Sequence, residues 1–511
     1  MVRYKSEIFV LIGGHSSTAA ETGRNSYGGK LIMTQLTTLD GQQKKLDGAT
    51  LQAFRAAVRG AVLTPADNGF NEARGIFNGM IDRKPGLIVC CSGVADVIQC
   101  VNLAREHRLL TAIRGGGHGV AGNASCDGGL MINLSLMRAV RIDTKARIAW
   151  VQGGATLGDV DHETSAFGLV CPGGVVSTTG VAGLTTGGGY GWVRGKHGMS
   201  IDNLRAVEIV TPDGQLRRAS AEENSDLFWA IRGGGGNFGV VVTFEFNVHP
   251  MPGQVMLCNP IYAAEHAHDV LRGWREFMKT APDEFTTEFF FWTIPEFPNY
   301  PGETHGQDVV VPCGVYLGPV EEGEKFVQPL RELAPTLLDF SGPMRFVDIQ
   351  QLFDPYLPYG GVQCYWKALY MDRMDDDMVG TLVDHFLDRP ENARICPLVL
   401  HNLNGASQRV PADATAFPGR KWKYLMEYNV TWSDPGDDDE GIAWTRRAWN
   451  EMREKYDQYD GTYLNIDSYN EDGNSWVQES YRENYARLQQ IKKKYDPMNL
   501  FRLNANIPPA A

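Results

Sequence analysis

The sequence has no long apolar run and no excess of positive charge. Its longest apolar stretches, such as FVLIGG and GVVVTF, are far shorter than the roughly 18 to 20 residues that a membrane-spanning helix needs. Lysine and arginine number 48 against 61 aspartate and glutamate residues, which gives a formal net charge of −13. This balance provides no net positive field for phosphate backbones or anionic lipid. We therefore expect neither a nucleic-acid partner nor a membrane partner.

Cysteine is scarce and shows no pairing pattern. The nine cysteines are odd in number, spread thinly and without CxxC spacing. They indicate neither a disulfide framework nor a zinc site, and we expect no metal. The apolar run near the N-terminus is short and closely preceded by Glu7, which does not fit a signal peptide. We therefore predict a reducing, cytoplasmic location.

Glycine, by contrast, is abundant and unevenly distributed. It is dense in segments 115–129, 153–198 and 233–239 and sparse after about residue 325. The chain has 511 residues, of which 43% are hydrophobic, and at roughly 100 to 200 residues per domain it should form two or three domains. The two halves are therefore expected to have different roles.

Patterns of hydrophobicity predict an α+β fold. Residues 46–252 show short β-branched strands between turns and helices. Residues 253–460 show long aromatic-rich strands alternating with amphipathic helices, as in an antiparallel sheet covered by helices on one face. Residues 461–511 predict a helix that stops before Pro497 and an extended tail.

The first 45 residues show weak periodicity. They are rich in glycine, serine, threonine and glutamine, so we predict a poorly ordered N-terminal extension. Met33 is a hypothetical native start within it.

The first glycine run, RGGGHG, follows the strand-like segment LLTAI. Consecutive glycines let backbone N–H groups turn inward as an anion-binding concavity, because no Cβ opposes positive φ or close approach. A tight turn between strands is the alternative reading. The run matches neither GxxxxGK[ST] nor GxGxxG, so Walker-type and Rossmann sites are not supported.

The second glycine run extends from Cys171 to Trp192 and contains almost only small residues. Such a backbone can lie against a large flat ligand over a long path, and an extended dinucleotide is the candidate. A floppy loop would leave Val175, Val176 and Leu184 needlessly apolar. The third run, near residue 235, is read as a turn that leads into a buried strand.

These segments, in this order, resemble the berberine-bridge-enzyme-like branch of the vanillyl-alcohol-oxidase superfamily, flavoproteins with a PCMH-type FAD-binding domain. The residues that carry the resemblance are RGGGHGVAGNASCDGGLMINLSLM, the run from Gly173 to Trp192, SIDNLRAVEIVTPDGQL, NSDLFWAIRGGGGNFGVV, YLNI and NYARLQQIKKKYDPMNLFRLNANIPP. The likeness begins at about residue 46 and is loose between 255 and 460. It implies a two-part FAD-binding domain over 46–252, a substrate-binding domain over 253–460 and a C-terminal segment, 461–511, that returns to the FAD domain.

The resemblance implies FAD as cofactor, joined through its 8α-methyl group to His118. Such a bond needs a nucleophilic nitrogen, and imidazole is only partly protonated near neutral pH. A structural histidine beside a turn is the alternative. The residues implied to border FAD are Arg114, Gly115, Gly116, Gly117, His118, Gly119, Gly122, Gly173, Gly174, Thr179, Gly180, Gly183, Gly187, Gly188, Tyr190, Gly191, Tyr463 and Asn465.

Some relatives add a second covalent bond, from a cysteine eleven residues before a GGG triplet. Here the residue eleven before Gly187 is Val176, and Cys171 lies sixteen before it. The sequence therefore resembles the relatives with a single bond. We interpret Cys171 as a small packed thiol rather than a second cysteinyl link.

The catalytic base is less clearly indicated. In the family an aromatic residue often follows the YxN motif and its phenol serves as base, whereas Ile466 stands there in this chain. Period-two alternation would place Tyr463 and Asn465 on one face and Ile466 on the other. Oxidation of an alcohol still requires a group that removes a proton. His401, Tyr428 and Tyr463 are the catalytic candidates, each with an ordinary structural role as the alternative.

Further polar residues on the presumed strands of the second domain are candidate substrate contacts: Glu288, Gln363, Tyr365, Asn402 and Glu427. Aromatic residues of the same strands, Phe289, Phe291, Trp292 and Trp366, suit either a pocket or core packing.

The resemblance implies an FAD-dependent oxidase that transfers hydride from an alcohol, sugar or amine C–H to flavin N5 and reduces dioxygen to hydrogen peroxide. Its partners would be a small-molecule substrate and dioxygen, and the sequence predicts no oligomeric state. One alternative is a dehydrogenase that uses a quinone or protein acceptor. The other is a binding protein that holds a nucleotide or glycan without turnover.

Overall fold

The computed structural model describes four stretches of the chain: 34–393, 396–456, 461–468 and 473–511. The hypothetical start at Met33 and most of the predicted N-terminal disorder lie outside these residues. The remainder of that extension differs from the prediction, because β1 (Thr34–Thr37) and β2 (Gln43–Leu46) form an antiparallel hairpin. Leu36 and Leu46 are buried in the core, which gives this short segment enough apolar contact to fold.

The domain expected to bind FAD, called the FAD-binding domain below, begins with a small mixed sheet. Its strand order is β3-β4-β6-β5, with β6 parallel to both β4 and β5. Helix α3 makes the crossover from β4 to β5 and packs against α1. The elements are α1 (Gly48–Ala57), β3 (Ala61–Leu63), α2 (Phe70–Arg74), β4 (Leu87–Cys90), α3 (Val94–His107), β5 (Thr111–Arg114) and β6 (Leu130–Asn133).

The second part is an antiparallel sheet in the order β11-β10-β12-β8-β7. The short pair β9 and β13 lies beside it. Helix α4 begins with a capping box at Thr156. The elements are β7 (Val140–Asp143), β8 (Ile148–Gln152), α4 (Leu157–Ser165), β9 (Leu169–Val170), α5 (Val181–Gly187), α6 (Arg194–His197), β10 (Leu204–Val210), β11 (Leu216–Ser220), α7 (Ser225–Gly234), β12 (Val240–Asn247) and β13 (His249–Pro250).

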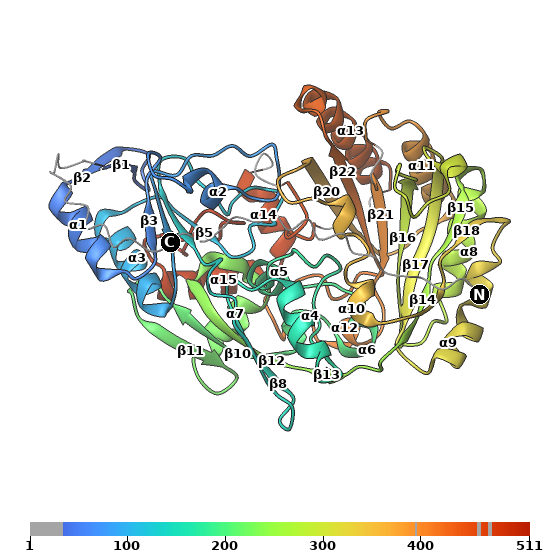
Figure 1. The fold of residues 1–511 in the computed structure, drawn as a ribbon, viewed down its shortest axis with the longest axis horizontal. Helices are drawn as coiled ribbons and strands as arrows, with labels where there is room; N and C mark the ends of the chain where they lie inside the picture. The colour runs from blue at the N-terminus through green and yellow to red at the C-terminus, as the bar shows by residue number, and fades with distance from the viewer. Residues whose placement is uncertain (1–33, 394–395, 457–460, 469–472) are drawn as a thin grey trace, which may run out of the picture.

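The domain expected to bind substrate is built on one large antiparallel sheet, which occupies the other half of Figure 1. Its main path runs β18-β15-β17-β16-β21-β22-β20, and β14 and β19 extend it. The strands are β14 (Val255–Cys258), β15 (Pro260–Ala263), β16 (Phe285–Thr293), β17 (Asp308–Tyr316), β18 (Thr336–Asp339), β19 (Gly342–Met344), β20 (Gln363–Met371), β21 (Leu398–Asn402) and β22 (Tyr424–Trp432).

Three helices, α8 (Ala267–Met278), α11 (Asp376–Leu387) and α13 (Asp438–Tyr456), cover one face of this sheet (Figure 1). The other face looks toward the FAD-binding domain. This arrangement confirms the predicted fold class. The smaller helices of the domain are α9 (Val320–Val327), α10 (Phe346–Ile349) and α12 (Ala406–Arg409).

The C-terminal segment returns to the FAD-binding domain, where Figure 1 shows the end of the chain. Helix α14 (Gly473–Tyr481) leads to α15 (Asn484–Tyr495), which packs against α7. The buried Lys492 Nζ donates to the backbone oxygen of Asn237 and to the carboxylate of Asp496, each at 2.6 Å. This charged anchor holds the last turn of α15 in the core.

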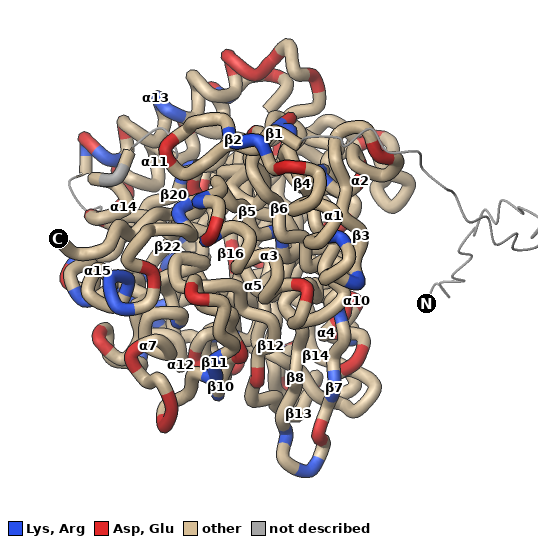
Figure 2. The backbone as a smooth tube through the Cα atoms, turned by 90° about the vertical axis from the view of Figure 1, so that its left-hand side faces the viewer, with Lys and Arg blue, Asp and Glu red and all other residues tan. Residues whose placement is uncertain are grey.

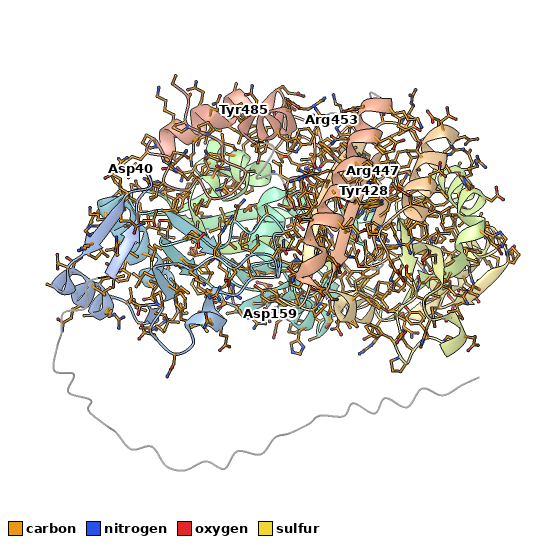
Figure 3. The ribbon with its side chains drawn as sticks, turned by 90° about the horizontal axis from the view of Figure 1, so that it is seen from above. Asp40, Asp159, Tyr428, Arg447, Arg453 and Tyr485 are labelled. Atoms are coloured by element: carbon orange, nitrogen blue, oxygen red, sulfur yellow. The ribbon has the colours of Figure 1, made fainter. Side chains whose placement is uncertain are left out.

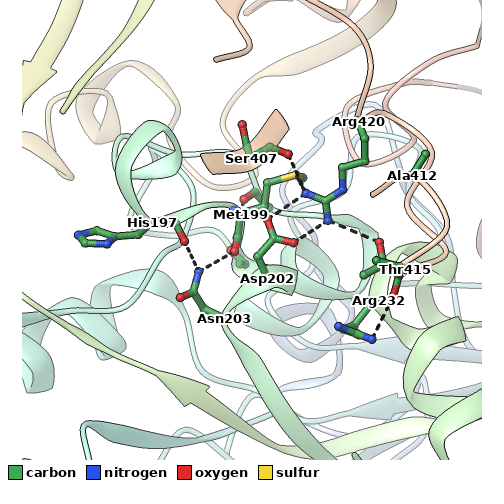
Figure 4. A network of polar contacts seen from close by, with 12 residues as sticks. His197, Met199, Asp202, Asn203, Arg232, Ser407, Ala412, Thr415 and Arg420 are labelled. Atoms are coloured by element: carbon green, nitrogen blue, oxygen red, sulfur yellow. Dashed lines mark hydrogen bonds and ion pairs between the residues drawn. The ribbon is translucent and has the colours of Figure 1, made fainter. Parts of the chain in front are cut away.

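A second buried ion pair joins the two domains. Figure 4 shows Arg420, which precedes β22, donating to Asp202 Oδ1 at 2.6 Å and Oδ2 at 2.9 Å. Its side chain is 2% exposed. Arg420 also donates to the backbone oxygen of Ser407, so one guanidinium fixes the loop before β22 against the FAD-binding domain.

Elsewhere, charges of both signs are interspersed along the side seen in Figure 2. The last turn of α15 carries three consecutive lysines, Lys492–Lys494, and the first turn of α13 carries three consecutive acidic residues, Asp438, Asp439 and Glu440. Within the described parts of the chain, no helix combines the length and hydrophobicity that crossing a bilayer requires.

Candidate functional site

A cavity of about 980 Å³ lies between the two domains. One wall is formed by the glycine runs of the FAD-binding domain and the other by the helix-free face of the large sheet. The C-terminal residues 463–467 and the segment 351–357 close its sides. Its size is at the upper end of the range for ligand and cofactor pockets, so the two glycine runs and the polar strand residues meet at one site.

The two glycine runs approach each other backbone to backbone. A Cβ on Gly116 would lie 2.4 Å from the Cα of Gly180, and a Cβ on Gly180 would lie 2.4 Å from the nitrogen of Gly116. No side chain fits at either position. At Gly119 and Gly183, which line the cavity, a Cβ would meet no atom within 4 Å. The backbone at these two positions is therefore open to a ligand.

His118 lines the cavity beside this glycine wall. The ring of Phe77 stacks on its imidazole, with centroids 3.9 Å apart and planes at 13°. Burial lowers the pKa of His118 to about 4, so the ring is neutral at physiological pH. Its Nε2 is buried and has no hydrogen-bond partner among the described residues. A neutral, partly unsatisfied imidazole facing a large cavity fits a residue that bonds to a flavin.

These features suit the cofactor implied by the sequence. The open backbone of the glycine runs can lie against a flat ring system and donate N–H groups to phosphates without a basic side chain. Asn504 from the C-terminal tail also lines the cavity, and its Oδ1 is buried without a partner among the described residues. The residues present therefore fit FAD.

Twelve residues proposed from the sequence to contact the flavin line this cavity. They are Gly115, Gly116, Gly117, His118, Gly119, Gly174, Thr179, Gly180, Gly183, Tyr190, Tyr463 and Asn465. The other six, Arg114, Gly122, Gly173, Gly187, Gly188 and Gly191, do not line it.

Packing explains two of these six positions, Arg114 and Gly187. Arg114 donates to the hydroxyl of Tyr359 at 3.1 Å. Gly187 allows Asn465 to come close, since a Cβ there would lie 1.9 Å from its Oδ1. These residues pack behind the residues that line the cavity and do not face the cavity themselves.

Cys171 is buried away from the cavity, and burial raises the pKa of its thiol far above the usual range. Val176, the residue eleven before Gly187, does line the cavity. The position from which a second covalent bond would be made is thus occupied by a side chain without a nucleophile.

The segment from Tyr463 to Ile466 differs from the predicted extended strand. It forms a turn, in which Ile466 N–H donates to the backbone oxygen of Tyr463 at 3.0 Å. The predicted alternation of faces is therefore wrong, and both Tyr463 and Ile466 line the cavity. The Tyr463 hydroxyl accepts hydrogen bonds from Gly189 N–H and Asn465 Nδ2, both at 2.9 Å. Burial raises its pKa to about 12.

On the opposite wall, Glu288, His401 and Glu427 form a buried cluster. His401 Nδ1 lies 3.0 Å from Glu288 Oε1, and His401 Nε2 lies 2.9 Å from Glu427 Oε1. The three side chains come from β16, β21 and β22, which are neighbours in the sheet, and all three line the cavity. Glu288 stands directly opposite His401, whereas Glu427 is diagonal to it on the same face.

The cluster controls the charge of His401. Burial by itself lowers the pKa of this imidazole, but the two flanking carboxylates outweigh it and raise the pKa to about 9. His401 is therefore an imidazolium at neutral pH. Arg194 from α6 donates at 3.2 Å to Glu288 Oε1, the same oxygen that lies against His401 Nδ1. For Glu288, burial raises the pKa but His401 and Arg194 outweigh it and lower the pKa.

Four other residues proposed from the sequence are absent from the cavity wall. Tyr428 is on the opposite face of β22, where its hydroxyl lies 2.6 Å from His385 Nδ1 and donates to Ala448 of α13. Figure 3 shows the molecule from above, with Tyr428 of β22 and Arg447 of α13 labelled. The others are Gln363, Tyr365 and Asn402.

Their position follows from strand alternation. Trp366 lines the cavity, so its neighbour Tyr365 points to the helices and accepts a hydrogen bond from Arg446. His401 lines the cavity, so Asn402 does not. Likewise Trp292 lines the cavity, whereas Phe289 and Phe291 pack against α8 and α11. The apolar composition of each strand alone did not show which of its side chains face the cavity and which face the helices.

Sequence reasoning missed Arg194 and the segment 351–357. Arg194 is completely buried and also donates to the backbone oxygens of Thr287 and Asn402. The segment supplies Phe353 and Tyr356 to the cavity. Neither carries a sequence motif, since their roles depend on contacts between residues far apart in the chain.

Comparison with known proteins indicates a family of FAD-binding proteins. Residues 85–220 match the family model of an FAD binding domain, and residues 462–508 match that of berberine and berberine-like proteins. An FAD-linked oxidoreductase of Dictyostelium discoideum is 31% identical over 441 residues, covering 85% of this chain and 91% of that protein. The (R)-6-hydroxynicotine oxidase of Paenarthrobacter nicotinovorans is 28% identical over 463 residues, covering 89% and 97%.

The fold is similar to solved structures over nearly the whole described chain. The crystal structure of 6-hydroxy-D-nicotine oxidase from Arthrobacter nicotinovorans has a TM-score of 0.78 at 26% identity. The match covers 89% of this chain and 98% of that one.

Proposed function

Because the chain belongs to the berberine-bridge-enzyme-like family of FAD-linked oxidoreductases, we propose that it is an oxidase with its flavin covalently bound at His118. Its substrate is a small molecule with a C–H bond next to oxygen or nitrogen, and dioxygen is the final electron acceptor. The observation that carries this proposal is one cavity that joins neutral His118 on one wall to the Glu288–His401–Glu427 cluster on the other.

FAD, when bound, supplies the two-electron oxidant that takes a hydride from carbon. The chain must then accept the proton that leaves oxygen or nitrogen. His401 is already protonated at neutral pH, so it does not fit the role of base. Glu427 fits it, because it faces the cavity and both of its oxygens are held, Oε1 near His401 and Oε2 by Asn429 Nδ2 at 2.9 Å.

His401 and Glu288 support this acceptor. The imidazolium stands between two carboxylates and holds Glu427 in place, and Arg194 and His401 share the Oε1 atom of Glu288. Tyr463 remains a candidate for flavin contact rather than proton transfer, because its hydroxyl has a high pKa and is already bonded to Gly189 and Asn465.

The covalent bond is tested with denatured protein. His118→Ala should lose the flavin fluorescence that stays with the wild-type polypeptide in a denaturing gel, because its attachment atom is gone. His107→Ala is the matched control, since this histidine at the end of α3 does not line the cavity. Flavin fluorescence that survives in His118→Ala would place the bond elsewhere.

The acceptor is tested with the intact holoenzyme. Stoichiometric hydrogen peroxide under air supports the oxidase. Turnover with a dye under argon, together with little peroxide under air, would instead identify a dehydrogenase.

A further inference from the structure

The plane of the His118 imidazole is set by one neighbouring ring. Phe77, in the loop between α2 and β4, stacks on it with centroids 3.9 Å apart and planes at 13°. Phe77 is completely buried and does not line the cavity, whereas His118 does. The last torsion of a histidine side chain has only a broad preference of its own, so this contact decides how the imidazole is turned.

The ring of Phe77 is itself held by the other domain. Trp366 of β20 meets it edge to face at 6.1 Å, and Tyr359, in the segment before β20, does so at 6.3 Å. The backbone is fixed from the same side, since Gly360 N–H donates to the Phe77 oxygen at 2.9 Å. Phe77 therefore stands between His118 and the large sheet and contacts both.

The backbone at Phe77 also fixes the loop that carries His118. Phe77 N–H donates at 3.0 Å to the oxygen of Gly117, one residue before the histidine. Two residues after it, the oxygen of Val120 accepts a hydrogen bond from Asn78 Nδ2 at 2.9 Å. The backbone of this loop and the ring of His118 are thus both positioned by residues 77 and 78.

The surroundings of the imidazole also keep it uncharged. Burial lowers the pKa of His118 to about 4, and no carboxylate among the described residues raises it. The charged and titratable side chains beside the loop are Arg114 and Tyr359, which are hydrogen-bonded to each other at 3.1 Å. Phe77 covers one face of the imidazole with an apolar ring, so it contributes to this burial.

We propose that Phe77 is a positioning residue for the covalent attachment of the flavin: its ring holds the His118 imidazole in one orientation and shields one face of it from water, so that a free ring nitrogen is presented to the cavity. This inference rests on the covalent bond proposed above. Phe77 acts through His118, because it does not reach the cavity itself. The Nε2 atom of His118, buried without a partner among the described residues, is the free nitrogen of this arrangement.

The attachment step defines what this position has to provide. A ring nitrogen of His118 forms a bond to the 8α carbon, one C–H bond of that methyl group breaks, and the methyl proton and the imidazole N–H proton are released. The two electrons of the broken C–H bond pass through the flavin ring to dioxygen, which leaves with the two protons as hydrogen peroxide. The nitrogen must bring a lone pair to one carbon atom, which a rotated or protonated imidazole does not do.

Phe77→Leu tests the positioning role in the full-length chain. The protein is produced without flavin and mixed with FAD under air, and covalent flavin is followed over time as fluorescence that stays with the polypeptide in a denaturing gel. Leucine is apolar but has no flat face, so attachment should be at least about tenfold slower. Reversibly bound FAD, measured as flavin that the native protein retains and acid releases, should remain within about twofold of wild type.

Phe70→Leu is the matched control. Phe70 of α2 is also a buried ring, but it packs against Ile88 and Met131 and does not line the cavity. Its loss should cost stability in a similar way while the attachment rate stays that of wild type. The comparison separates the loss of a core ring from the loss of the stack on His118.

The pH dependence of attachment gives an independent readout. Phe77→Ala opens one face of the imidazole to water, so the pKa of His118 should rise from about 4 toward its ordinary value near 6.5. Between pH 8 and pH 5.5 the neutral fraction of His118 would then fall about tenfold in the variant and hardly at all in wild type. The ratio of the two attachment rates should fall with it, whereas a purely structural role for Phe77 predicts a ratio that is constant with pH.

The outcomes distinguish this inference from the function on which it rests. A wild-type chain that never acquires covalent flavin contradicts the proposed bond and removes the inference with it. Covalent flavin on His118 of wild type, with equal attachment rates in Phe77→Leu and Phe70→Leu, contradicts the positioning role alone. A loss of reversible FAD binding that accounts for the whole decrease in Phe77→Leu also contradicts it, because Phe77 would then shape the binding site rather than position the histidine.

Discussion

Two histidines of this site respond in opposite ways to burial. His118 is next to apolar groups and the ring of Phe77, so burial lowers its pKa to about 4. His401 is equally enclosed but stands between two carboxylates, which raise its pKa to about 9. The first is therefore a neutral imidazole and the second a cation. Under the proposed function, one residue type would serve flavin attachment on one wall and electrostatic positioning on the other.

Glu427→Gln tests the proton acceptor. The amide keeps the shape of the side chain but does not accept a proton, so kcat should fall by about 100-fold or more, with flavin content unchanged. Glu451→Gln is the matched control, because Glu451 also contacts a histidine, His385 Nε2 at 3.1 Å, but on the helix side of the sheet. The kcat of both variants is measured by steady-state kinetics. A similar kcat in the two would contradict the role of Glu427.

The raised pKa of His401 predicts a pH-dependent stability. A group whose pKa is higher in the folded state stabilises the fold below its unfolded pKa, near 6.5, and loses that contribution as the pH rises through about 9. At about 1.4 kcal/mol per pKa unit, the contribution is about 3 kcal/mol at most. The unfolding midpoint of His401→Gln should therefore lie below that of wild type at pH 6.5, and the gap should narrow toward pH 9.5. A gap that is constant with pH would rule this explanation out.

At the scale of elements, the glycine runs act in two different ways. Gly116 allows two backbones to touch, whereas Gly119 opens the backbone to the cavity. Strand order has an equally direct effect. Because β21 lies between β16 and β22, residues that are more than a hundred positions apart in the sequence form one cluster.

Gly116→Ala and Gly119→Ala separate these two uses of glycine. The new Cβ at position 116 would lie 2.4 Å from the Cα of Gly180, so the apoprotein should be destabilised by about 1 to 3 kcal/mol. The new Cβ at position 119 meets nothing, so the apoprotein should keep its unfolding midpoint while flavin incorporation falls. Thermal unfolding of apoprotein and absorbance at the flavin band give the two readouts. A destabilised apoprotein in Gly119→Ala, or a loss of flavin without destabilisation in Gly116→Ala, would contradict these two roles.

At the scale of the whole molecule, the contact between the two domains, called the joint below, forms the site, because the cavity lies between them. Arg194 and Arg420 both cross this joint as buried cations, to Glu288 and Asp202 respectively. If either arginine is removed, the carboxylate that it contacts loses this partner in the interior. The cavity lies between the bodies that these arginines connect, so stability of the joint and geometry of the site are coupled.

Arg420→Ala should therefore be strongly destabilising. Asp202 would remain buried without its partner, which costs about 3 to 5 kcal/mol, and the unfolding midpoint should fall by several degrees. Arg409→Ala is the matched control, because its ion pair with Asp283 is exposed and should contribute little. Thermal unfolding of both holoproteins checks this difference, and equal midpoints would contradict the role of the buried pair.

Local features determined much of this protein at the level of its sequence. The dense glycine runs predicted a wall where backbone approaches backbone or ligand closely, and the family resemblance implied FAD and His118 there. Strand and helix periodicity likewise indicated the helix-covered antiparallel sheet. The register of individual strands was less accessible, because a nearly uniform apolar strand such as β20 or β22 has no alternation that tells its two faces apart. Tyr428 and Tyr365 were assigned to the wrong side for that reason.

Tertiary structure alone decided how the opposite wall works. The charge of His401 depends on Glu288 and Glu427, which reach it only through strand pairing, and Arg194 reaches Glu288 from another domain. A pKa is set by the charges and solvent within a few ångströms of the group, and no local segment of sequence contains those distances. The same holds for the aromatic residues Trp292, Phe353 and Tyr356 of the cavity, which come from β16 and from the segment before β20.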